Sequence, residues 1–226
     1  DVTVQWKATG SMVGAWNMLI YGSAMYAMEQ ISGDNKVGYQ KTSFAFYFLG
    51  LTNLMFNWGH HTYIVPASPA IKQVSYIISM TELILFANII MKWKKGLLKS
   101  HADEYMLSTR FLKSADRWVL LNLGLAIAIS IPYVNLYTHG TQVTVAHAMG
   151  TTIGINTMLL LASVAFIFEQ RLKPAAKKYI LAGLTTMNIS LLVFWLSLLA
   201  AGVVRSIEQY QHTYFCRSVC TYIALF

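Results

Sequence analysis

Charged side chains are scarce in this sequence. Asp, Glu, Lys and Arg together make up 12% of its 226 residues, against about a quarter in an ordinary soluble domain. That is too little charge to cover a soluble surface. Hydrophobic residues make up 56% of the chain, and they fall in runs of about twenty, the length that crosses a hydrocarbon core of roughly 30 Å as a helix. The lipid bilayer is therefore the expected solvent.

Cysteine is nearly missing as well, and the positive charge is not gathered on one surface. Cys216 and Cys220 lie one helical turn apart, and two thiols make neither a disulfide framework nor a zinc site. The formal net charge is +8, but Lys and Arg cluster between the apolar runs and not along one soluble face. Nucleic acid is therefore not an expected partner.

The apolar runs predict an all-α fold. A spanning chain must satisfy its backbone polar groups internally, so runs of this length predict helices. The runs cover roughly residues 10–28, 43–58, 74–91, 118–137, 145–168 and 179–204, and residues 213–226 are a candidate short seventh. We expect a polytopic bundle of about six spanning helices, forming a single transmembrane domain over residues 1–226.

The connections between the runs differ in charge. Thirteen of the seventeen Lys and Arg lie in the odd-numbered connections, residues 29–42, 92–117 and 169–178, whereas the even-numbered ones, around residues 59–73 and 138–144, contain only Lys72. The positive-inside rule places the odd connections in the cytoplasm. The even-numbered connections then face the periplasm or the outside.

Four of the six histidines then lie near the periplasmic face, namely His60, His61, His139 and His147. His60 and His61 stand side by side at the end of an apolar run, where imidazole is costly unless it is paired or coordinated. Imidazole suits iron, copper and zinc alike, so the residues leave the metal open. A pair hydrogen-bonded to loop carbonyls is the alternative. His101 and His212 are expected to be solvated.

The segment from Tyr137 to Gly150 contains two further ligand types, His147 and Met149. Two positions along a helix correspond to about 200° of rotation, so these side chains project from opposite faces. Histidine and methionine both serve as axial ligands to haem iron. One helix could thus reach two cofactors, although core packing also explains one methionine among eleven.

Glu82 is the one carboxylate well inside a predicted membrane helix. A buried carboxylate shifts toward its neutral form unless a cation or hydrogen bonds compensate, so Glu82 should face the bundle interior. The functional interpretation is proton relay or support of a metal, and the alternative is a hydrogen-bonded structural glutamate.

These motifs together resemble nitric oxide reductase, a branch of the haem-copper oxidase superfamily. The resemblance rests on Gly59-His60-His61, on Glu82 one helix later, and on Tyr137-Thr138-His139-Gly140-Thr141-Gln142 followed by Ala146-His147. It is clearest over residues 57–156 and continues weakly to about residue 209. The histidine-proline-glutamate-valine-tyrosine signature of the oxygen-reducing branch is missing from the sequence, which favours the nitric oxide branch.

The resemblance implies a role for each of these residues. His60 and His61 would bind a non-haem iron, with copper as the alternative metal, and His147 would be the proximal ligand of a high-spin haem b. Glu82 would lie near this binuclear centre as a catalytic residue, and His139 near the haem propionates. Nitric oxide would be reduced there to nitrous oxide and water, with electrons from a cytochrome c or a quinol.

Three departures from the family pattern limit this transfer. The family's catalytic subunit has about twelve helices, so this chain resembles its C-terminal half, and other membrane subunits would supply the rest. Met149 stands where the family's low-spin haem takes a histidine, so the second haem has either changed its ligand or been lost. The counterpart of the helix that carries a further metal-binding histidine and a glutamate, residues 9–17, has neither.

We therefore expect a haem-bearing, nitric oxide reductase-like respiratory subunit whose non-haem site is completed by a partner chain. A non-catalytic structural or electron-transfer membrane subunit derived from the same family is the alternative, favoured by the departures at residues 9–17 and Met149. Dismutation of nitric oxide to nitrogen and oxygen is a third hypothesis. A channel or transporter would give no reason for His60, His61 and His147 to gather near one membrane face.

Overall fold

A computed structural model describes residues 18–33, 68–96 and 104–223, with scattered positions among residues 4–16 and 40–48. Every regular element in this part of the chain is a helix, which confirms the predicted all-α class there. In chain order these are α2 (Met18–Ser32), α4 (Pro69–Gly96), α5 (Met106–Ser130), α6 (Pro132–Thr138), α7 (Gln142–Met149), the π-helix η4 (Gly150–Thr157), α8 (Met158–Phe168), the 3-10 turn η5 (Glu169–Arg171) and α9 (Pro174–Ile223).

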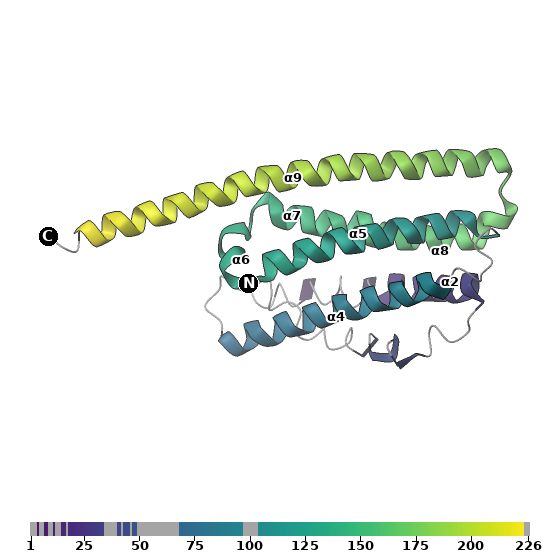
Figure 1. Cartoon of the computed structure of the whole chain (residues 1–226), viewed down its shortest axis with the longest axis horizontal. Helices are drawn as coiled ribbons and strands as arrows, with labels where there is room; N and C mark the ends of the chain where they lie inside the picture. Colours follow the sequence, from purple (N-terminus) through teal and green to yellow (C-terminus); the bar gives the residue numbers. More distant parts are fainter. Residues whose placement is uncertain are drawn as a thin grey trace.

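The helices are stacked in layers (Figure 1). α9 runs along one side, α5 and the continuous rod of α7, η4 and α8 form the middle, and α2 and α4 lie on the other side. α5 packs on α8 and η4, α7 and α6 pack on α9, and α2 packs on α8. The C-terminal part of α9 extends beyond the rest of the bundle. The rod is therefore held between α5, α9 and α2.

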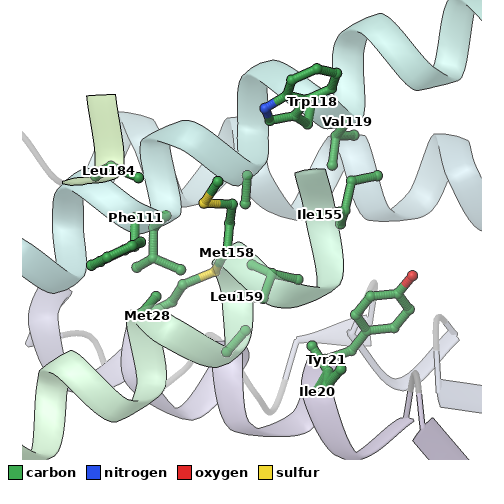
Figure 2. Packing of buried hydrophobic residues seen from close by; sticks show 14 of the residues in the cluster. Ile20, Tyr21, Met28, Phe111, Trp118, Val119, Ile155, Met158, Leu159 and Leu184 are labelled. Atoms are coloured by element: carbon green, nitrogen blue, oxygen red, sulfur yellow. The ribbon is translucent and has the colours of Figure 1, made fainter. Parts of the chain in front are cut away.

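The hydrophobic core lies where α2, α5, α8 and α9 meet (Figure 2). Met158 and Leu159 of α8 are fully buried, and they face Met28 of α2 and Phe111 of α5. The buried positions of α5 recur three and four residues apart, which is the period of a helix with one buried face. This packing fixes α8, and with it the helix that leads back to His147.

Two helical stretches are long and apolar enough to cross a membrane, Gln142–Arg171 and Pro174–His212. They coincide with the fifth and sixth apolar runs. Among the described residues, these two stretches are the ones that meet the criteria of length and apolar composition. The count of six spanning helices therefore stays a prediction.

Two boundaries differ from the sequence-based expectation. The connection expected at residues 92–117 is helical from Met106, because Leu107, Phe111 and Trp118 form a buried stripe whose cationic neighbours Arg110 and Arg117 point outward. The stretch from residue 213 does not begin a seventh helix, since α9 continues without a break to Ile223. The basic connection is thus shorter than expected, and the last helix is longer.

Candidate functional site

The structure describes some of the predicted site residues and not others. His60 and His61 lie outside the described residues. Glu82 lies in the middle of α4, and its side chain is also outside the described part. His139, His147 and Met149 are described, and they lie at the corner between α6 and α7 and in α7 itself. The site can therefore be built from the helix that carries His147.

The corner that carries His139 is fixed by threonines. The hydroxyls of Thr141 and Thr144 both donate to the backbone carbonyl of Thr138, at 2.7 and 3.3 Å. Thr141 also caps α7, because its hydroxyl oxygen accepts from the N–H of Val143 at 3.3 Å. His139 ends α6, with its N–H donating to a carbonyl one turn earlier, and its side chain is half-buried. These polar residues hold the start of α7 in one position.

α9 holds this corner from outside. Gly202 packs directly against the backbone of Val143, so that a Cβ atom at residue 202 would collide with it. Tyr210, two turns further along α9, contacts the ring of Tyr137 edge-on at a centroid distance of 5.2 Å. The beginning of α7 is therefore fixed both by its own corner and by α9.

His147 lies in the last turn of α7, with a half-buried side chain whose Nδ1 atom is buried. Its backbone carbonyl accepts hydrogen bonds from Nδ2 of Asn122 and from the hydroxyl of Thr151, each at 3.1 Å. Nδ2 of Asn122 also donates to the Thr151 hydroxyl at 2.6 Å. The three groups form one closed set of hydrogen bonds around the backbone of His147.

The π-helix η4 begins three residues after His147. Gly150 and Gly154 line one side of it, and Cβ atoms there would lie 2.6 Å from Oδ1 of Asn122 and 2.5 Å from Cγ of Trp118. Small residues four apart let two membrane helices approach closely, which is how η4 and α5 meet here. π-helical segments inside α-helices are rare and frequently mark functional sites.

The described donors suit a haem better than an isolated metal ion. Imidazole and thioether are both axial ligands of haem iron, and His147 and Met149 present them on the same short helix from half-buried positions. Among the side chains that the structure describes, no three His, Cys, Asp or Glu come together in a way that could hold a metal ion. A non-haem metal would need ligands from elsewhere in the protein, and the predicted pair His60 and His61 lies there.

Three residues that support this arrangement were not singled out from the sequence. Asn122 and Thr151 are ordinary polar residues in apolar runs, and nothing local indicates that they meet at the His147 carbonyl. Glu169 was expected in a cytoplasmic connection, but it is fully buried. A polar side chain is costly at membrane depth unless it faces the interior of the bundle. This cost is the signal by which the sequence could have indicated such residues.

The described part of the chain is thus an apolar helical bundle with two helices long enough to cross a membrane and a histidine just before a π-helix. The chain belongs to the family of cytochrome c and quinol oxidase polypeptide I, which it matches over residues 1–225. This confirms the resemblance to the haem-copper oxidases. The chain is accordingly a membrane subunit like those of the respiratory haem-copper oxidases.

The chain is 22% identical over 202 residues to a subunit of the nitric oxide reductase of Stutzerimonas stutzeri. The alignment covers 85% of this chain but 42% of that protein, so the chain spans less than half the length of this relative. No solved structure matches the chain significantly.

Proposed function

We propose that this chain forms the haem-bearing part of a membrane oxidoreductase that reduces nitric oxide to nitrous oxide. His147 would be the axial ligand of a high-spin haem b. The observation that carries the proposal is the placement of His147, a half-buried imidazole beside a π-helix, in a chain that aligns with part of a nitric oxide reductase. The family match accounts for the class of cofactor, and the residues of α7 supply the donor chemistry.

The described residues would each contribute a physical role. His147 would hold the iron from a helix whose two ends are fixed, by Thr141 at the start and by Asn122 at the end. His139, at the corner, would donate to the haem propionates. When bound, the haem would supply a redox-active iron that passes the donor's electrons to nitric oxide. The protein's part is to fix this geometry and keep water away from it.

Residues outside the described part complete the proposal. His60 and His61 would bind the non-haem iron, or copper in its place, and Glu82 of α4 would support that centre or carry protons to it. The remaining helices of the family fold would come from the rest of a longer chain or from another membrane subunit. Electrons would arrive from a cytochrome c or a quinol. The odd-numbered connections would face the cytoplasm of a bacterial inner membrane, and the histidines the periplasm.

The direct test is a haem absorption spectrum of the purified membrane complex, with iron and copper counted per chain. We expect one high-spin haem and one further metal atom. His147→Ala should remove the high-spin haem while the helical circular dichroism is kept. His212→Ala is the matched control, because His212 is exposed on α9 and should leave the spectrum unchanged. A high-spin haem that survives in His147→Ala would refute the ligand assignment.

Met149 favours a second candidate, a member of the same family that transfers electrons or supports assembly without turning over nitric oxide. A methionine in place of the family's histidine would alter or abolish the low-spin haem through which electrons arrive. The same measurement separates the candidates. Haem with a second metal supports the reductase, haem alone supports an electron carrier, and neither supports a structural role.

A further inference from the structure

The backbone carbonyl of His147 lies where the hydrogen-bond ladder of the helix changes. In an α-helix a carbonyl accepts from the N–H four residues later, and in a π-helix from the N–H five residues later. α7 ends at Met149 and η4 begins at Gly150, so His147 lies in the last α-helical turn before this change. Its carbonyl accepts from the N–H of Gly150 and from the side chains of Thr151 and Asn122. One backbone N–H and two side chains are thus directed at this one carbonyl.

Asn122 comes from a different helix, α5, and is 3% exposed. Both of its contacts use Nδ2, to the His147 carbonyl and to the Thr151 hydroxyl. Oδ1 of Asn122 is buried against Gly150 and has no hydrogen-bond partner among the described residues. An unpaired buried acceptor is destabilising, so an apolar side chain of similar branched shape, such as leucine, would avoid this cost. Core packing alone therefore does not explain an asparagine here.

The position of an imidazole ring follows from the backbone that carries it. A change in the bonding of the His147 carbonyl would rotate the peptide group between residues 147 and 148 and shift the Cα–Cβ direction of the histidine. Functional groups have to be held within about 0.5 Å of their working geometry, and residues behind them supply that constraint. Asn122 and Thr151 are the side chains that touch the His147 backbone at this point.

We propose that Asn122 and Thr151 are positioning residues, which fix the α-to-π change after His147 and thereby set the orientation of its ring toward the haem iron. This inference rests on the proposed function, because it concerns the same histidine and the same haem. It goes further because it says what sets the orientation of the His147 ring: a side chain from the neighbouring helix α5 and a hydroxyl of the π-helix.

The test is the iron–histidine stretching frequency of the reduced protein, measured by resonance Raman spectroscopy on the whole purified complex. Thr151→Val removes the hydroxyl and keeps the shape of the side chain, whereas Thr151→Ser keeps the hydroxyl. We expect Thr151→Val and Asn122→Leu to shift or broaden this band with the haem content per chain retained. Because Thr151→Ser keeps the hydroxyl, this variant should show the same band as the wild type.

Asn135→Ala is the matched control. Asn135 is 5% exposed, also donates through Nδ2 to a backbone carbonyl, that of Ile129 at 2.9 Å, and also has a buried Oδ1, but it contacts the end of α5 and not the backbone of His147. Its substitution should lower stability and leave the band in place. If Asn122→Leu fails to fold, the two Thr151 variants decide.

Two failures can be told apart. If the wild-type complex contains no haem, or keeps its high-spin haem in His147→Ala, the proposed function fails and the positioning role fails with it. If the haem is lost in His147→Ala but the band is identical in Thr151→Val, Asn122→Leu and the wild type, only the positioning role is overturned. A band that shifts equally in Asn135→Ala would also overturn it, because the shift would then report general loosening of the bundle.

Discussion

The carboxylate of Glu169 accepts a hydrogen bond of 2.7 Å from the backbone N–H of Leu107, although the two residues are 62 positions apart. It accepts a second bond of 3.2 Å from the N–H of Ser108, and Lys177 lies 3.6 Å from the same carboxylate. The first N–H groups of a helix have no partner within the helix, and they favour a negative charge. Glu169 therefore caps α5, whose own N-cap residue, Tyr105, makes no side-chain cap bond.

Glu169→Ala should destabilise the protein by about 3 kcal/mol, because it leaves two buried N–H groups of α5 unpaired and removes charged hydrogen bonds. Glu169→Gln should cost less, since its amide oxygen can still accept one bond. The measurement is thermal or denaturant unfolding of the detergent-solubilised protein, followed by circular dichroism. Glu104→Ala is the control, because Glu104 bonds Gln170 at the same end of the bundle but is exposed, and its loss should cost under about 1 kcal/mol. Equal losses in the two variants would contradict the capping role.

Gly202→Ala should destabilise the protein by about 1–3 kcal/mol, because the added Cβ meets the backbone of Val143 and the two helices have to separate. Gly183→Ala is the matched control on the same helix, since no atom lies within 4 Å of its added Cβ. Alanine there should be neutral or stabilise α9 by up to about 1 kcal/mol, the usual difference between these residues in a helix. Unfolding curves of the two variants, measured side by side, check the prediction. A stabilised Gly202→Ala variant would show that α7 and α9 are not in close contact.

The sequence predicts best those helices that pack against lipid or against a uniformly apolar surface. The rod from Gln142 to Phe168 and most of α9 follow from continuous apolar runs, because hydropathy alone decides them. The start of α5 was misplaced for the opposite reason. Its first turns carry several cationic residues and resemble a connection, although the spacing of Leu107, Phe111 and Trp118 already has the period of a helix with one buried face.

The supports of the candidate site could not be predicted from the sequence in the same way. An amide from α5 reaches the His147 carbonyl just before the π-helix, and the Glu169 cap bonds two N–H groups far away in the chain. Both are tertiary contacts between polar groups, and no local pattern encodes them. His147 and Met149, by contrast, could be singled out as candidate ligands from residue type and spacing, because a helix places them on opposite faces whatever surrounds it, and their role stays a prediction.

Met149→Leu should leave the high-spin haem on His147 unchanged, because the two side chains leave α7 about 200° apart. Leucine is close to methionine in volume, so the fold should tolerate the change at a cost under about 1.5 kcal/mol. The measurement is haem per chain together with the absorption spectrum in the oxidised and reduced states. A second, low-spin signal in the wild type that disappears in Met149→Leu would assign the thioether as its ligand. Loss of the high-spin signal would instead show that the two residues serve one haem.

A polar cluster inside the bundle gives the last prediction. Oδ1 of Asn188 in α9 accepts bonds from the hydroxyl of Ser114 at 2.7 Å and from Nε1 of Trp118 at 2.9 Å, both in α5. Asn188→Ala leaves both donors unpaired and should destabilise the protein by about 1–2 kcal/mol, in the range found for buried polar groups and somewhat above the average for hydrogen bonds between membrane helices.

The Asn188–Ser114 bond can be isolated with a double-mutant cycle. Because Ser114→Ala and Asn188→Ala each remove that bond, the double variant should cost less than the sum of the single ones, by about 0.5–1 kcal/mol. Unfolding of the four proteins by sodium dodecyl sulfate in mild detergent gives these energies, and Trp118 emission should shift only when Asn188 is replaced. Thr185→Ala is the control, because its exposed hydroxyl donates to Leu181 within α9 and joins no second helix. If the costs of the two single variants simply add, Asn188 and Ser114 do not interact, and Trp118 is the partner through which Asn188 links α9 to α5.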